Sequence, residues 1–171
     1  MNARRQPNNG GGRSLTLEIC LDKIKNHLIE DVIPEVNMIS QAPDASMFTE
    51  VDEFGNLRFP CLDHINSIFI FLNELFDVRR IKERDIRSHA KKVTESISKA
   101  SGSYSALNLC LKHHIHFQGI KRHSAALYKD LRGVNSTLTK IKKIPEIKKV
   151  PAIKEVLKHP KTKKLIENLG K

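Results

Sequence analysis

Tryptophan is absent from the 171 residues, and aromatic residues make up only 5% of the chain. Six of the seven phenylalanines lie between residues 48 and 76, so that the last third holds only Phe117 and Tyr128. Proteins that bind single-stranded nucleic acid place stacking rings along a basic groove. The sequence therefore argues against that mode of binding. It leaves phosphate contacts of low sequence specificity as the expected way to bind nucleic acid.

Long apolar runs are also missing from the sequence. The sequence contains no stretch of 18 apolar residues that could span a membrane. The start of the chain also lacks the apolar core of a secretory signal. We therefore expect a soluble intracellular protein without a membrane partner.

Cysteine is scarce, and Cys20, Cys61 and Cys110 stand far apart, each among apolar neighbours. An odd number of isolated cysteines favours buried, reduced thiols over a disulfide framework or a metal site. This pattern agrees with an intracellular location.

The sequence has no signature of catalysis or of cofactor binding. His113, His114 and His116 would point in different directions on a helix, and no Cys or carboxylate stands at ligand spacing beside them. The glycines at 10–12 do not follow a strand, as a phosphate-binding loop does. We predict a protein that is not an enzyme, with no catalytic residue, no metal and no cofactor.

Positive charge is abundant and unevenly distributed, with a formal net charge of +11. Residues 112–171 carry 16 Lys and Arg against 4 Asp and Glu, whereas residues 1–60 carry 6 against 9. A field of this kind attracts acidic partners. We expect such a partner to meet the last third of the chain.

The spacing of apolar residues in the first half predicts helices. Residues 1–13 are rich in Gly and Asn and are expected to form a disordered basic arm. Apolar residues three and four apart then predict an amphipathic helix, with Ser14 as its N-cap and Pro34 marking its end or a kink. Residues 41–60 alternate between apolar and polar types, which indicates a long loop or a small hairpin. The widest apolar face, over 61–76, predicts the core helix.

The helical period continues through residues 79–99, and the sequence "ASGS" at 100–103 is the clearest internal break. Gly119 and Gly133 are expected to punctuate the helices that follow, over about 104–116 and 120–131.

The predicted fold is an all-α helical bundle. Its divisions are a disordered arm (1–13), an N-terminal helical half (14–100) and a basic C-terminal helical half (101–171).

Residues 69–99 and 141–171 align without a gap. Nine positions are identical, and five more match in apolar character. The two halves could be related by duplication, or two basic amphipathic segments could agree by composition alone. Both interpretations remain open.

The final segment, residues 141–171, holds ten lysines and three prolines. Pro151 and Pro160 each precede a short apolar-periodic run, and proline is tolerated at the first position of a helix. Pro145 is expected to stop the helix before it. We therefore predict that residues 134–171 are ordered helix rather than a tail. The apolar stripe that supports this prediction consists of Leu138, Ile141, Ile144, Ile153, Val156, Leu157, Leu165 and Leu169.

The same segment resembles the signature of the helical N-terminal domain of transcription elongation factor S-II and of related integrase-binding-type domains. Val150 and Pro151 stand for the family's Leu-Pro, and Leu157 stands for the leucine that ends its short helix. Thr162 stands where the family has a glycine. The residues at or beside the family's final Lys, Val, Leu and Lys are Lys163, Leu165, Leu169 and Lys171. The resemblance covers about 35 residues and implies a helical bundle that docks acidic-hydrophobic peptides of transcription or chromatin factors.

We predict a non-catalytic helical module that binds a polyanion, namely nucleic acid (DNA or RNA) or chromatin, through phosphate contacts in the nucleus. The alternative is an adaptor whose basic groove binds an acidic protein segment. The sequence leaves the oligomeric state open. The candidate binding residues are Lys142, Lys143, Lys148, Lys149, Lys154, Lys158, Lys161, Lys163 and Lys164, with Arg4, Arg5 and Arg13 of the arm.

Overall fold

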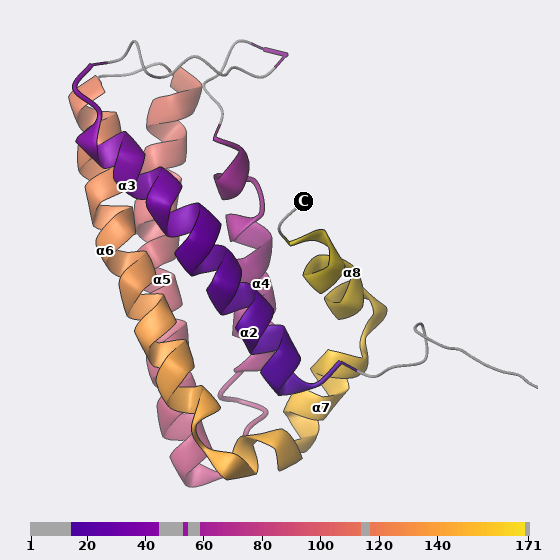
Figure 1. The fold of residues 1–171 in the computed structure, drawn as a ribbon. Coiled ribbons are helices and arrows are strands. Elements are labelled where there is room, and N and C mark those ends of the chain that lie inside the picture. Colours follow the sequence, from indigo (N-terminus) through magenta and orange to yellow (C-terminus); the bar gives the residue numbers. More distant parts are fainter. Residues whose placement is uncertain (1–14, 45–52, 55–58, 114–116, 170–171) are drawn as a thin grey trace, which may run out of the picture.

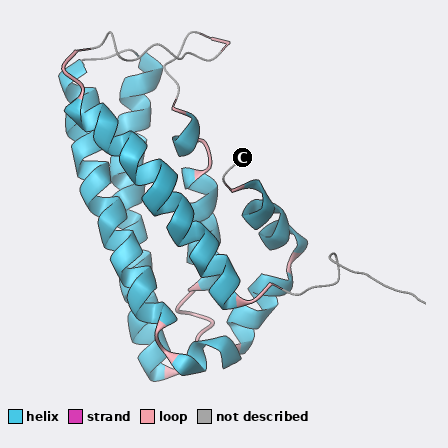
Figure 2. Ribbon diagram, viewed as in Figure 1, coloured by secondary structure: helices cyan, strands magenta, loops and turns pink. Residues whose placement is uncertain are grey.

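A computed structural model describes residues 15–44, 53–54, 59–113 and 117–169. Helices dominate these residues and no strand occurs among them, which confirms the predicted all-α class (Figures 1 and 2). The elements follow one another as α2 (Leu17–His27), the π-helical η1 (Leu28–Val32), α3 (Ile33–Gln41), the 3-10 helix η3 (Pro60–Leu62), α4 (Ile65–Leu75), α5 (Arg84–His113), α6 (Phe117–Lys142), the 3-10 helix η4 (Pro145–Lys149), α7 (Pro151–Lys158) and α8 (Pro160–Asn168).

The first three elements form one continuous helical rod. Its N-cap is Thr16, not Ser14 as predicted: the Thr16 hydroxyl accepts a hydrogen bond from the Ile19 N–H at 3.1 Å, and Ser14 lies outside the described residues. Pro34 does not end the rod, because a π-helical turn precedes it. The Ile33 N–H reaches the Leu28 carbonyl, five residues back. We attribute the continuity of the helical rod at Pro34 to this wider turn, because it relieves the clash that a proline ring makes in a regular helix.

The predicted break at 100–103 is wrong, because these residues lie inside α5. Gly119 and Gly133 likewise lie inside α6 and do not interrupt it. Two long antiparallel helices replace the shorter predicted ones, because Ala100 and Leu107 on one side and Val134 on the other are buried against the bundle. Burial of an apolar stripe outweighs the propensity cost of about 1 kcal/mol for an exposed glycine.

The final segment is helical, as predicted, through the end of α6, η4, α7 and α8. Pro145, Pro151 and Pro160 each occupy the first position of a helix, where no N–H partner is lost. The apolar stripe is only partly buried: Ile153 is fully enclosed, whereas Leu157 and Leu165 are half-buried.

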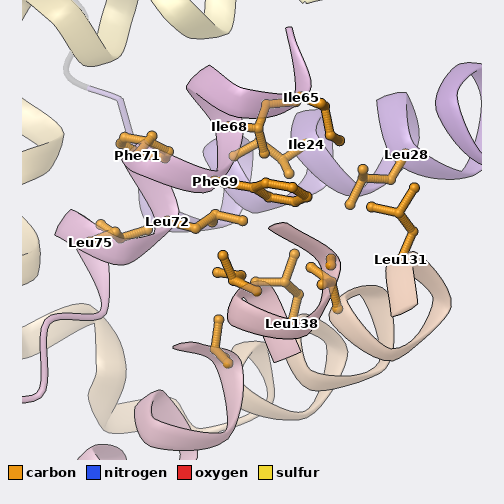
Figure 3. Packing of buried hydrophobic residues seen from close by; sticks show 14 of the residues in the cluster. Ile24, Leu28, Ile65, Ile68, Phe69, Phe71, Leu72, Leu75, Leu131 and Leu138 are labelled. Carbon is orange, nitrogen blue, oxygen red and sulfur yellow. The ribbon is translucent and has the colours of Figure 1, made fainter. Parts of the chain in front are cut away.

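One hydrophobic core joins the elements from α2 to α8. Helix α4 supplies much of it, and Figure 3 shows Phe69 of α4 among Ile24 of α2 and Leu138 of α6. Helices α5 and α6 pack along each other, α3 packs on α6, and α7 and α8 pack against α4 and α2. In Figure 1, α4, α7 and α8 lie to the right of the α5–α6 pair, and the α2–α3 rod crosses in front of it.

Four further expectations from the sequence concern the N-terminal arm, the loop or hairpin, the domain boundary and the two aligned segments. The expected arm at 1–13 and most of the expected loop or hairpin at 41–60 lie outside the described residues. The boundary expected between residues 100 and 101 falls inside α5. The two segments that align at a separation of 72 residues take different courses, since 84–97 lies within the single helix α5 and its counterpart, 156–169, breaks between α7 and α8.

Candidate functional site

The lysines predicted to bind a polyanion lie on the last four helical elements and on the turn after α6. Each is at least partly accessible. Lys142 ends α6 and Lys143 follows it, whereas the others are distributed over η4, α7 and α8. Short turns join these elements, and η4 and α8 each contact α7. The elements that carry these lysines are therefore neighbours in the fold, and six of the lysines are well exposed without an ion pair in the described part of the chain: Lys143, Lys149, Lys154, Lys158, Lys161 and Lys164.

The other three predicted lysines already have acidic partners. Lys142 pairs with Asp22 of α2. Lys148 Nζ lies 3.5 Å from a carboxylate oxygen of Glu18, and Lys163 Nζ lies 4.0 Å from one of Glu167. Exposed pairs of this kind are worth roughly 0–1 kcal/mol, so an incoming phosphate can compete with them.

Lys25 of α2 belongs to the same basic region, although the sequence did not single it out. Burial lowers the pKa of Lys25, and the nearby charge of Lys142 lowers it further. Asp22 raises this pKa in part, and Lys143 again lowers it. Positive charges therefore crowd around the junction of α2 with the end of α6, where a bound anion would relieve their repulsion.

A groove of about 610 Å³ runs between α4 and the α7–α8 pair. Apolar side chains line part of it, and Ile70 among them is 54% exposed. Lys161 and Lys164 of α8 line the groove, and so does Glu74 of α4. The groove thus combines apolar side chains with charges of both signs.

Two contacts fix the helices that form this groove. Arg80 Nη2, after α4, lies 2.8 Å from a carboxylate oxygen of Glu155 on α7. The buried Thr162 hydroxyl donates a 2.7 Å hydrogen bond to the Val156 carbonyl, which holds α8 against α7. Thr162 stands where the S-II family, which the segment resembles, has a glycine. In this protein the Thr162 hydroxyl joins α8 to α7.

Burial differs among the three cysteines, and it sets the pKa of two of their thiols. All three cysteines are free. Burial raises the pKa of Cys20 to about 12 and that of Cys61 to about 11, which keeps both thiols protonated. The expectation of burial holds for Cys20 alone, since Cys61 and Cys110 are half-buried.

The remaining predicted residues cannot be placed in a site. His114 and His116 lie outside the described residues, as do Arg4, Arg5 and Arg13. No group of three or more metal-ligating side chains occurs within 15–44, 53–54, 59–113 and 117–169.

Comparison of the chain with protein-family models, curated proteins and solved structures finds no match. Among the described helices, none is both long enough and apolar enough to cross a membrane.

Proposed function

We propose that the protein is a non-catalytic helical module that binds nucleic acid through the phosphate backbone. The observation that carries this proposal is that the most basic part of the chain is folded. Exposed lysines on η4, α7 and α8 project from short helices that are anchored in the core by Ile147, Ile153 and Ile166. A fixed array of charges binds phosphates with less loss of side-chain and chain entropy than a tail does. A nuclear location, in transcription or chromatin, is part of the proposal.

The test is a titration of the full chain with a random-sequence DNA duplex at several salt concentrations. About four or five phosphate contacts give a log–log slope near −4. We expect similar affinities for unrelated sequences, because phosphates carry no base information. If no binding appears at about 50 mM salt, the nucleic-acid proposal is overturned.

A second candidate is an adaptor that docks an acidic peptide with one or two apolar anchors, as the family resemblance implies. The observation in its favour is the α4–α8 groove, which the exposed Ile70, Lys161 and Lys164 all line. Its test is binding of such a peptide, which should depend weakly on salt and should be lost in Ile70→Asp. Duplex binding that survives this substitution would separate the groove from the phosphate-binding lysines.

A further inference from the structure

The α5–α6 hairpin carries a second basic surface, and two hydrogen bonds between the helices define it. Ser96 Oγ lies 3.0 Å from Thr137 Oγ1, and Ser103 Oγ donates to Asp130 Oδ2 at 2.6 Å. Both contacts fit one antiparallel register. Ser103 lies seven residues after Ser96 on α5, and Asp130 lies seven residues before Thr137 on α6. All four side chains are half-buried, so they mark a seam between the core and the solvent.

The helical period places the core on one side of this seam. Val93 and Ala100 lie three residues before and four residues after Ser96, and both are buried. Val134 and Ile141 have the same relation to Thr137 on α6, and both are buried. One side of the seam is therefore closed by the bundle.

Basic and small residues occupy the opposite side. Lys92 and Lys99 lie four residues before and three residues after Ser96, and Lys140 lies three residues after Thr137; all three are exposed. Gly133 lies three residues after Asp130 and is exposed, and a Cβ added there would meet nothing within 4 Å. Two further basic residues on this side are Arg122, near the start of α6, and Lys129, in its middle. We call this surface the outer face, and its basic residues are Lys92, Lys99, Arg122, Lys129 and Lys140.

The charge of the outer face is largely uncompensated. None of its five basic side chains takes part in an ion pair within the described part of the chain, in contrast with Lys142, Lys148 and Lys163. Three acidic residues lie on or beside it, and one of them is the exposed Asp85, seven residues before Lys92 on the same face of α5. Glu95 stands on α5 between Lys92 and Lys99, and Asp130 at the seam already accepts the Ser103 hydrogen bond.

The shape of the face limits what it can bind. From Arg122 to Lys140 it extends for about 27 Å along α6, at a rise of about 1.5 Å per residue. Exposed Gly133 and Ser136 lie along this line, so that long side chains do not stand between the charges. An extended, open array of cations suits a regular row of phosphates better than a single acidic side chain.

We propose that the outer face of α5 and α6 is a second contact surface for the backbone of double-helical nucleic acid. This inference rests on the proposed function. It adds a surface on a different pair of helices from the lysines of η4, α7 and α8. Lys143, exposed in the turn after α6, lies between the two surfaces in the sequence and can serve either.

The experiment uses two variants of the full chain with equal loss of charge. One is Lys99→Gln/Lys129→Gln/Lys140→Gln on the outer face. The comparison variant, Lys149→Gln/Lys154→Gln/Lys158→Gln, removes three lysines of η4 and α7 that the proposed function places at the phosphates, so it should weaken binding as well. Each is titrated with the random duplex over a range of salt. Because the outer face adds phosphate contacts to those of η4, α7 and α8, the wild-type slope should be steeper than about −4. We expect the outer-face variant to bind at least tenfold more weakly and to have a salt slope shallower than that of the wild type by about two to three.

Lysine acetylation, read residue by residue by mass spectrometry, separates local contact from a general effect of net charge. Bound duplex should protect Lys99, Lys129 and Lys140, while exposed Lys82 between α4 and α5 serves as an internal control. If the wild type binds but the outer-face lysines react as fast as in the free protein, the outer face is excluded and the proposed function stands. If the wild type binds no duplex, both proposals fall.

Discussion

Ser103 of α5 donates a hydrogen bond of 2.6 Å to Asp130 of α6, and this contact joins the two longest of the described helices. A single-residue shift of either helix would break it. We expect Ser103→Ala and Asp130→Ala to lower the free energy of unfolding with a coupling of about 0.5–1.5 kcal/mol in a double-mutant cycle. Denaturant unfolding of the four proteins measures this coupling. Strictly additive effects would show that the contact does not hold the two helices in register.

Gly102 and Gly133 interrupt neither α5 nor α6, and both are solvent-exposed. An added Cβ would meet nothing within 4 Å at either position. Alanine should therefore raise the free energy of unfolding by about 0.5–1 kcal/mol at each site, since glycine loses more backbone entropy in a helix. Thermal and urea unfolding of Gly102→Ala and Gly133→Ala test this expectation. A loss of stability would mean that the backbone at the site is not regular helix.

The anchor of the C-terminal helices is Ile153, which is fully buried on α7. Ile153→Ala should lower the free energy of unfolding by about 2–5 kcal/mol, because it leaves a cavity in a packed core. Leu157→Ala, at a half-buried position of the same helix, should cost clearly less. The exposed neighbour Lys154→Gln is the matched control and should stay within about 0.5 kcal/mol of the wild type. Equal losses for Ile153→Ala and Leu157→Ala would contradict the assigned burial.

The sequence predicted helix type and the ordered C-terminal segment because both depend on local periodicity. Each of these signals affects only the few residues next to it in the chain. They are the apolar stripe through Leu138 and Ile141 and the prolines Pro151 and Pro160. The break at 100–103 was wrongly predicted, because Gly102 is a weak helix former. The burial that outweighs it comes from Leu131 and Val134 of a distant segment. The same dependence on distant residues explains Pro34, where a π-helical turn keeps the rod continuous.

The candidate site likewise has a part that the sequence could predict and a part that depends on distant residues. Charge density along the chain predicted the lysines of η4, α7 and α8 as candidates, and the structure shows that η4 and α8 each contact α7. Charge density could not show that Asp22 of α2 pairs with Lys142, or that Lys25 lies beside it. The sequence alone could not predict the outer face either. Only an unbroken α5 in register with α6 brings Lys99 and Lys129 onto one surface.

Glu35 of α3 is a half-buried carboxyl group whose Oε2 atom has no hydrogen-bond partner in the described structure. Burial raises the pKa of Glu35, and hydrogen bonds from Cys61 offset this only in part. The carboxyl group of Glu35 therefore holds its proton more tightly in the folded state than in the unfolded chain. The stability that this proton provides is complete below the ordinary value of 4.5 and is lost as the pH rises through the pKa of the folded state.

Glu35→Gln keeps the shape of the side chain and removes the charge. We expect it to raise the free energy of unfolding at pH 7 by up to about 1 kcal/mol and to change it little at pH 4. Urea unfolding across this pH range measures the difference. Glu30→Gln, at an exposed position on η1, is the control for a loss of negative charge alone. A destabilised Glu35→Gln at pH 7 would show that the ionised carboxylate makes a favourable contact there.

Lys25 offers a direct test of where a polyanion binds. Its pKa is lowered by burial and by the nearby charges of Lys142 and Lys143. A phosphate bound at the junction of α2 and α6 supplies negative charge and should raise the pKa of Lys25. Titration of the Lys25 side-chain signals by NMR, with and without a short DNA duplex, measures this change. The rise should disappear at high salt, where the duplex dissociates. A duplex that binds and leaves the pKa of Lys25 unchanged would place the phosphates elsewhere, and the outer face of α5 and α6 would then be the surface to test next.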